Sequence, residues 1–123
     1  MSVLDVRITS YRIGADAVVV GIAGEFDLYA TDEIRTRLGE LVEGGARSVI
    51  VDLLGAGFLD SAGLGVLVAT AKALRAGGGE LVLVADDRRI LRTIQIAGLE
   101  KLFRTEPSLV EAVQDVIDER LAR

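Results

Sequence analysis

The chain has 123 residues, a length typical of one domain, and its net charge of −5 comes from 19 acidic and 14 basic side chains. This charge opposes binding to nucleic acid and to anionic lipid. Cysteine and histidine are both absent, which excludes disulfides, thiolate metal sites and serine–histidine catalysis. Half of the residues are hydrophobic but only 4% are aromatic, so we expect one domain, residues 1–123, with an aliphatic core.

The N-terminal third predicts two strands and a helix. Residues 3–13 alternate loosely and residues 17–23 form a β-branched run, with Gly-Ala-Asp between them, a pattern typical of an antiparallel hairpin. From Ala30 onward the apolar residues recur at helical spacing, and the helix is expected to stop at Gly44 and Gly45. The N-terminus lacks the apolar run of a secretory signal.

The rest of the chain alternates buried strands with helices. Residues 48–54 and 81–85 are short apolar runs, typical of parallel strands covered on both faces. A glycine-rich connection follows the first run, and Leu102 and Phe103 are expected to form a short last strand. Apolar stripes predict helices over residues 64–74, 90–97 and 109–121, with glycine stops after the first two and a capping-box spacing from Ser108 to Glu111 before the third.

This order of elements predicts an α/β fold with right-handed βαβ units. We expect a mixed, mostly parallel sheet of four to five strands, with an antiparallel N-terminal hairpin and about four helices packed on the sheet. No uncharged stretch reaches the roughly 18 apolar residues that cross a bilayer. We therefore expect no membrane span and a cytoplasmic location.

The segment GFLDSAGLG, residues 57–65, raises several alternatives for Ser61. A catalytic serine is poorly supported, because Leu59 stands where a nucleophile elbow needs glycine and no histidine exists to take the proton. A nucleotide-binding glycine loop is also poorly supported, because Asp60 stands where the third glycine would be and no P-loop motif occurs. A helix cap fits better, since Ser61 directly precedes a predicted helix and a cap contributes about 1 kcal/mol.

A cap alone does not explain the two glycines that follow. Gly63 and Gly65 fall inside the first helical turn, where each costs roughly 1 kcal/mol relative to alanine. A helix start without bulky side chains lets another protein approach the hydroxyl, and its free amides tolerate a phosphate. A phosphate on Ser61 would add about −1.5 to −2 charges beside Asp60. We therefore expect a modification that changes surface charge without unfolding the domain.

Carboxylates also suggest a metal or nucleotide site. Asp27, Asp52 and Asp60 fall near the carboxyl ends of predicted strands, where α/β sheets place ligands, although caps and loop solvation explain each of them more simply. Weak nucleoside triphosphate hydrolysis at Asp27, Asp60 and Ser61 is the enzyme alternative. No lysine or arginine lies between Phe58 and Thr70 to hold phosphates, so we expect no metal and no cofactor.

Two segments resemble a known family. VDLLGAGFLDSAGLGVL, residues 51–67, and GEFDLYATDEIRTRL, residues 24–38, are similar to the signature motifs of the STAS family of anti-sigma factor antagonists. The order of strands and helices matches over essentially the whole chain. The resemblance implies a regulatory binding protein that is not an enzyme.

The resemblance also implies a mechanism of partner switching. The unmodified antagonist would bind an anti-sigma factor that is an ATP-dependent serine kinase, and this binding would free the sigma factor. Phosphorylation of Ser61 by the kinase would end the binding, and a metal-dependent serine phosphatase would restore it. Many relatives carry a second hydroxyl after this serine, whereas this chain has Ala62, so Ser61 is the single candidate acceptor.

The same resemblance predicts the partner-binding residues. They are expected to be Asp27, Asp60, Ala62, Gly63, Leu64 and Gly65. The chain is expected to be a monomer or a weak dimer. The alternative is an accessory subunit of a lipid or anion transport complex, which would bind through the same helix end without a phosphate switch.

Overall fold

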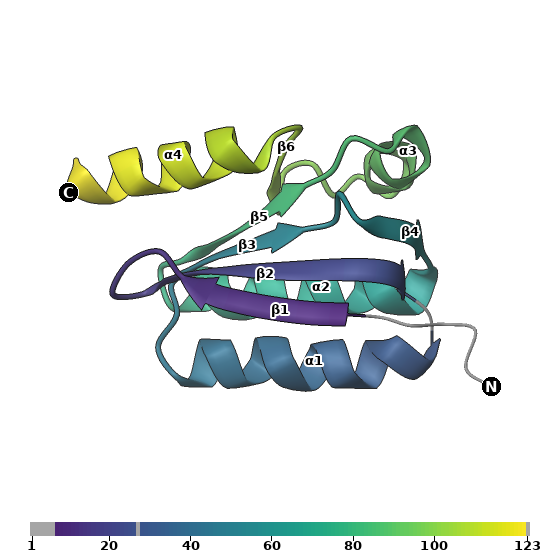
Figure 1. The fold of residues 1–123 in the computed structure, drawn as a ribbon, viewed down its shortest axis with the longest axis horizontal. Helices are drawn as coiled ribbons and strands as arrows, with labels where there is room; N and C mark the ends of the chain where they lie inside the picture. Colours follow the sequence, from purple (N-terminus) through teal and green to yellow (C-terminus); the bar gives the residue numbers. More distant parts are fainter. Residues whose placement is uncertain (1–6, 27, 123) are drawn as a thin grey trace.

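The computed structural model describes residues 7–26 and 28–122, which form an α/β fold (Figure 1). In chain order the elements are β1 (Arg7–Arg12), β2 (Ala17–Phe26), α1 (Leu28–Glu43), β3 (Ser48–Asp52), β4 (Ala56–Leu59), α2 (Ser61–Ala76), β5 (Glu80–Val84), α3 (Arg88–Ile96), β6 (Arg104–Glu106) and α4 (Leu109–Leu121). The predicted α/β class, antiparallel hairpin and four helices are confirmed.

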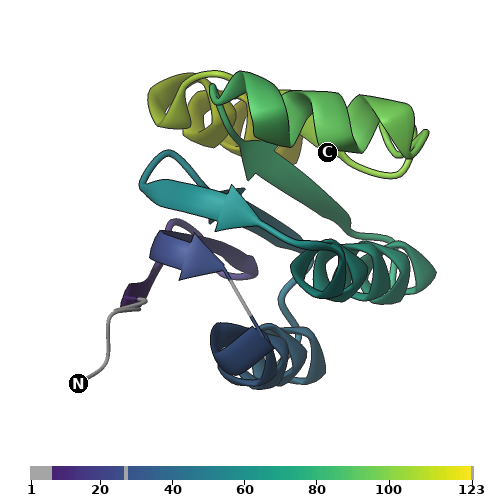
Figure 2. The same ribbon diagram turned by 90° about the vertical axis from the view of Figure 1, so that its right-hand side faces the viewer.

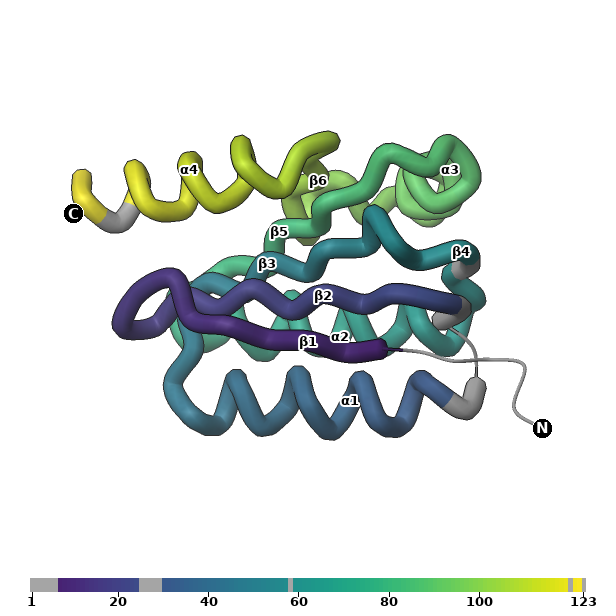
Figure 3. Tube along the Cα trace, viewed as in Figure 1, coloured from purple at the N-terminus to yellow at the C-terminus, as the bar shows by residue number. Residues whose placement is uncertain are grey.

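The long strand β2 organises the sheet. β1 pairs with β2 antiparallel, and β3, β5 and β6 follow in parallel, in the order β1-β2-β3-β5-β6. The first part of β2, Ala17–Gly21, pairs with β3. Its later residues Gly24–Phe26 pair with β4, and the register of this pairing shifts between Gly24 and Glu25. Figure 3 follows β2 past β3 and on to β4.

Two predictions about strands need correction. The sheet has six strands, because β4 forms where the sequence pattern predicts only a glycine-rich connection. β4 forms since β2 continues beyond β3 and offers free backbone groups to a parallel neighbour. The last strand is Arg104–Glu106 and not Leu102 and Phe103. Phe103 is 3% exposed because it enters the core from the preceding turn, and its apolar character reflects that burial.

The predicted glycine stops of the helices are confirmed, and α2 shows how they work. Gly78 has a φ of 80°, which favours glycine, and its N–H donates to the Arg75 carbonyl at 3.0 Å. The N–H of Gly79 donates to the Leu74 carbonyl at 2.7 Å. This pair of bonds defines a Schellman motif, and the same pair ends α1 and α3. The Ser108 cap of α4 is also confirmed, since its Oγ accepts from the Glu111 N–H at 3.3 Å.

The helices surround the sheet unequally. α1 and α2 pack together on one face, while α3 and α4 lie along the side of the molecule opposite α1 (Figures 1 and 2). The main core joins the sheet to α1, α2 and the buried side of α3, and a smaller core lies under α4. Among the residues that the structure describes, the main core is aliphatic, as predicted, apart from Phe103. This packing fixes the start of α2 at the end of the short strand β4.

Candidate functional site

Asp60 forms the N-terminal cap of α2. Its backbone is extended, with φ −89° and ψ 178°, and its carboxylate accepts from the N–H of Gly63 at 2.7 Å. Its carbonyl accepts from the N–H of Leu64 at 2.9 Å. The interpretation of Ser61 as the cap is therefore wrong, because Ser61 is the first helical residue and the aspartate before it already satisfies the helix end.

Ser61 is left with its hydroxyl uncommitted. The residue is exposed, and no hydrogen bond joins its side chain to any other residue that the structure describes. It stands on the first turn of a 16-residue helix, where the positive end of the helix dipole tolerates an anion. The position suits a hydroxyl that another protein modifies.

The residues after Ser61 divide into inner and outer positions. Ala62 and Leu64 are half-buried, Gly63 is buried, and Gly65 is exposed. A Cβ added at Gly65 would meet nothing within 4 Å. Packing among the described residues therefore gives no reason for glycine at position 65, and its effect is to leave the outer side of the first turn bare.

The predicted carboxylates do not gather into a metal site in the part of the chain that the structure describes. Asp27 lies outside the described residues. Asp52 uses its carboxylate to accept from the N–H of Leu54 at 2.9 Å, and Asp60 uses its own as the helix cap. The simpler explanation of these two residues, turn and cap, is the one that the structure supports.

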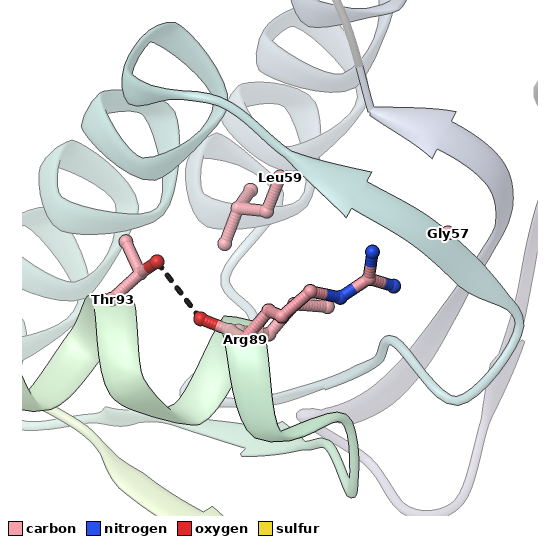
Figure 4. Close-up of a pocket in the computed structure, with 5 residues that line it drawn as sticks. Gly57, Leu59, Arg89 and Thr93 are labelled. Carbon is pink, nitrogen blue, oxygen red and sulfur yellow. Dashed lines mark hydrogen bonds between the residues drawn. The ribbon is translucent and has the colours of Figure 1, made fainter.

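A small hollow lies beside this site, between β4 and α3. It has a volume of about 140 Å³ and is lined by Gly57, Leu59, Arg89, Ile90 and Thr93 (Figure 4). Ligand pockets usually reach about 300–1,000 Å³, so this hollow is too small for a nucleotide. Sequence reasoning did not find it, because β4, which forms one wall, was not predicted.

Arg89 at the edge of this hollow is engaged by Asp87. The two side chains form an ion pair at 2.9 Å, and Asp87 also caps α3 by accepting from the N–H of Arg89 at 2.8 Å. The hydrogen bonds from the Arg89 side chain and backbone lower the pKa of Asp87 to about 2. The Thr93 hydroxyl donates to the backbone carbonyl of Arg89 at 2.9 Å. The one cationic side chain that lines the hollow, Arg89, is thus already paired with Asp87.

None of the helices that the structure describes is long and apolar enough to cross a membrane.

Comparison with known proteins connects this geometry to a family. The family model described as "STAS domain" matches residues 9–112. The anti-sigma-B factor antagonist of Bacillus subtilis is 38% identical over 86 residues, which are 70% of this chain and 78% of that protein. An anti-sigma factor antagonist from Mycobacterium paratuberculosis superposes with a TM-score of 0.82 at 27% identity, over 91% of this chain and 94% of that one.

The anti-sigma factor antagonist SpoIIAA has the same fold in two solved forms. Its unphosphorylated form superposes with a TM-score of 0.80 at 23% identity, over 91% of this chain and 97% of that chain. Its phosphorylated form superposes with a TM-score of 0.75 at 22% identity, over 89% of this chain and 99% of that chain.

The chain belongs to the STAS domain family, so the predicted resemblance is confirmed. Within that family its relatives are anti-sigma factor antagonists, and the comparisons support this role for it.

Proposed function

We propose that this protein is an anti-sigma factor antagonist that is switched by phosphorylation of Ser61. The unphosphorylated form binds an anti-sigma factor with serine kinase activity, and this binding releases the sigma factor. The observation that carries the proposal is the division of roles at the start of α2, where Asp60 caps the helix and the exposed Ser61 hydroxyl stays free of partners among the described residues.

The geometry suits a switch that leaves the fold intact. The cap belongs to Asp60, so a phosphate on the Ser61 oxygen removes no hydrogen bond from α2. The added charge of about −1.5 to −2 stands next to the Asp60 carboxylate and repels a partner fitted to the uncharged hydroxyl. A serine phosphatase then restores the binding form.

The partner-binding surface in this proposal surrounds Ser61. It comprises Asp60, Ala62, Gly63, Leu64 and Gly65. Asp27, which lies outside the described residues, is the sixth partner-binding residue of the proposal. The exposed Gly65 lets the backbone of a partner approach the first turn closely, because no side chain covers it. The buried Gly63 contributes through its N–H, which holds the Asp60 carboxylate in place.

The chain acts in this scheme as a ligand and a substrate, without catalysis of its own. The kinase supplies the nucleotide, and we expect this protein to need no metal or cofactor. The proposed place of action is the cytoplasm, where sigma factors act.

The test is phosphorylation and binding with the anti-sigma factor kinase isolated from the same cells. Wild-type protein should gain one phosphate, mapped by mass spectrometry to Ser61, and should then lose its binding. Ser61→Ala should bind the kinase about as well as the unmodified wild type and should stay bound in the presence of ATP.

Ser10→Ala is the matched control, because Ser10 is an exposed serine on β1 and not at a helix start. This variant should behave as wild type in both assays. Phosphate at another residue, or a Ser61→Ala protein that ATP still releases from the kinase, would contradict the proposal. Recovery of transporter subunits in place of a kinase would support the accessory-subunit alternative.

A further inference from the structure

The helices α3 and α4 carry opposite charges. α3 contains three arginines and no acidic residue, a charge of +3. α4 contains Glu111, Asp115, Asp118 and Glu119 against Arg120, which is four acids and one base, a charge of −3. In a chain whose net charge is −5, α3 is therefore a local positive region.

The outer side of α3 combines unpaired cations with apolar surface. Arg88 and Arg92 are exposed, and neither forms an ion pair with another described residue, whereas Arg89 is paired with Asp87. Ile96 is 74% exposed. We define the arginine face by the residues that line one open hollow of about 570 Å³: Arg88, Leu91, Arg92, Gln95 and Ile96.

The outer side of α4 has the complementary composition. Val110 is 77% exposed and Leu121 is 80% exposed, the two highest values among the large hydrophobic side chains that the structure describes. Exposed carboxylates lie between them on the same side. We define the acidic face as Val110, Glu111, Gln114, Asp118 and Leu121, the exposed positions opposite the buried Ala112 and Val116.

The two faces are placed so that each can meet its complement on a second molecule. Both helices lie along the side of the molecule opposite α1, in both views (Figures 1 and 2). Each helix turns its buried residues inward, Ile90 and Ile94 in α3 and Ala112 and Val116 in α4. A second copy rotated by half a turn can therefore set its α4 against the first α3, and its α3 against the first α4.

We propose that two copies of this chain associate through the arginine face of one and the acidic face of the other, in a closed pair with two equal contacts. Such twofold pairs are the commonest form of homo-oligomer. A second copy suits both faces, because it offers both the opposite charge and the apolar residues that each face needs. The pairing goes beyond the proposed switch and does not involve Ser61.

The charges set the expected salt dependence. Arg88 and Arg92 form no ion pair with another residue that the structure describes, so their attraction for Glu111 and Asp118 of the second copy is available for association. Attraction between exposed charges is screened beyond about 10 Å at 0.1 M salt. We therefore expect association at low salt and partial dissociation at high salt. Contacts between the apolar residues should supply the attraction that remains at high salt.

Sedimentation equilibrium of the full chain at about 50 mM and about 500 mM NaCl tests the proposal. The wild type should form dimers at low salt. Arg88→Glu with Arg92→Glu should weaken association by about tenfold or more, and Ile96→Gln should weaken it at both salt concentrations. Adding Glu111→Arg and Asp118→Arg to the arginine variant should restore the dimer, since both contacts regain opposite charges.

Arg7→Glu with Lys72→Glu is the matched control, because it makes the same change in net charge at exposed positions on β1 and α2. It should leave the dimer unchanged, and circular dichroism should show that every variant is folded. A chain that stays monomeric at low salt overturns the proposal. So does a dimer that the arginine variant does not weaken, or an arginine face that binds the anti-sigma factor or anionic vesicles and not a second copy.

Discussion

Asp60 and Ser61 are neighbours with separate tasks. The carboxylate of Asp60 holds the N–H of Gly63 at 2.7 Å and so satisfies one of the free donors at the helix start. Because that donor is already satisfied, the Ser61 hydroxyl can be modified or replaced without exposing an unpaired backbone group. The stability of α2 and the chemistry of Ser61 are thus carried by different side chains.

Gly65 gives a prediction about the proposed partner surface. Gly65→Ala should raise the free energy of unfolding by up to about 1 kcal/mol, because alanine favours the helix and its Cβ meets nothing within 4 Å. The same methyl group should weaken binding to the anti-sigma factor, because it occupies the bare outer side of the first turn. Urea denaturation and binding calorimetry measure the two effects separately.

Gly79→Ala provides the contrast. A Cβ at Gly79 would clash with the carbonyl oxygen of Arg47, so the backbone must shift and the domain should lose about 1–3 kcal/mol. Where Gly79→Ala still folds, its partner affinity should match that of the wild type. A stable Gly65→Ala protein with unchanged affinity would remove Gly65 from the partner surface.

The sequence motif singled out residues 60–65 but did not predict that Asp60, and not Ser61, caps the helix. Aspartate and serine are both good N-terminal caps, and they stand side by side here, so helical periodicity could not say which of them begins the helix. The extended backbone of Asp60 decides it. The neighbouring hollow could not be predicted for a different reason. Arg89 and Thr93 come to line it with Gly57 only through tertiary packing.

A charged cluster connects α4 to the sheet. Arg104 of β6 forms ion pairs with Glu119 of α4 and with Glu80 of β5, the second at 3.4 Å. Glu106, on the same strand, is 13% exposed, and its Oε2 lies 3.9 Å from the Arg104 Nε, without a hydrogen-bond partner among the described residues. Burial, and then the nearby Asp115 carboxyl, raises the pKa of Glu106.

The raised pKa of Glu106 fixes the sign of a pH effect. A group whose pKa is higher in the folded than in the unfolded state stabilises the fold most below its unfolded pKa, where it is protonated. This stabilisation is lost as the pH rises through the folded pKa. The side chain at position 106 cannot ionise in Glu106→Gln, so this variant should not lose that stabilisation as the pH rises. The free energy of unfolding of Glu106→Gln relative to wild type should therefore increase from pH 4 to pH 7, as measured by urea titration at several pH values.

Glu43→Gln is a suitable control, since Glu43 is an exposed carboxylate at the end of α1 and far in sequence from this cluster. The difference in the free energy of unfolding between Glu43→Gln and wild type should not show the same rise from pH 4 to pH 7. A Glu106→Gln protein whose relative stability falls between pH 4 and pH 7 would mean that the attraction of Arg104 for the Glu106 carboxylate outweighs burial and Asp115.

The helices were more predictable than the short strands because their signals are local. Apolar spacing and glycine stops lie within the helix itself, so the ends of α1, α2 and α3 followed from sequence. β4 and β6 have four and three residues, and each exists because a neighbouring strand offers backbone partners. Pairing of that kind connects distant parts of the chain and leaves little trace in the pattern of either segment.

For the molecule as a whole, the class of fold followed from the alternation of strand and helix patterns along the chain. Apolar runs at β3 and β5, separated by an amphipathic α2, predict parallel strands with helices on the sheet, and the structure pairs β3 with β5 in parallel. The pairing of one long strand with both β3 and β4 is a property of the assembled sheet. It places the start of α2 beyond the end of β3, where Ser61 is exposed.

Phosphorylation of Ser61 should act on partner affinity and leave the stability of the domain nearly unchanged. Phosphate on Ser61 should change the free energy of unfolding by less than about 1 kcal/mol, because attraction to the helix N-terminus and repulsion from Asp60 oppose one another. Moving the partner from 99% bound to 1% bound requires about a 10⁴-fold loss of affinity. Repulsion of the partner, and not unfolding, must supply that loss.

Parallel urea denaturation and binding calorimetry on phosphorylated and unphosphorylated protein measure both quantities. Ser61→Asp should lose less affinity than the phosphoprotein, since a carboxylate carries a smaller charge than a phosphate of about −1.5 to −2. A phosphoprotein destabilised by several kcal/mol would instead indicate that the start of α2 melts on modification. The Asp60 cap argues against melting, because its bond to the Gly63 N–H does not use the oxygen that accepts the phosphate.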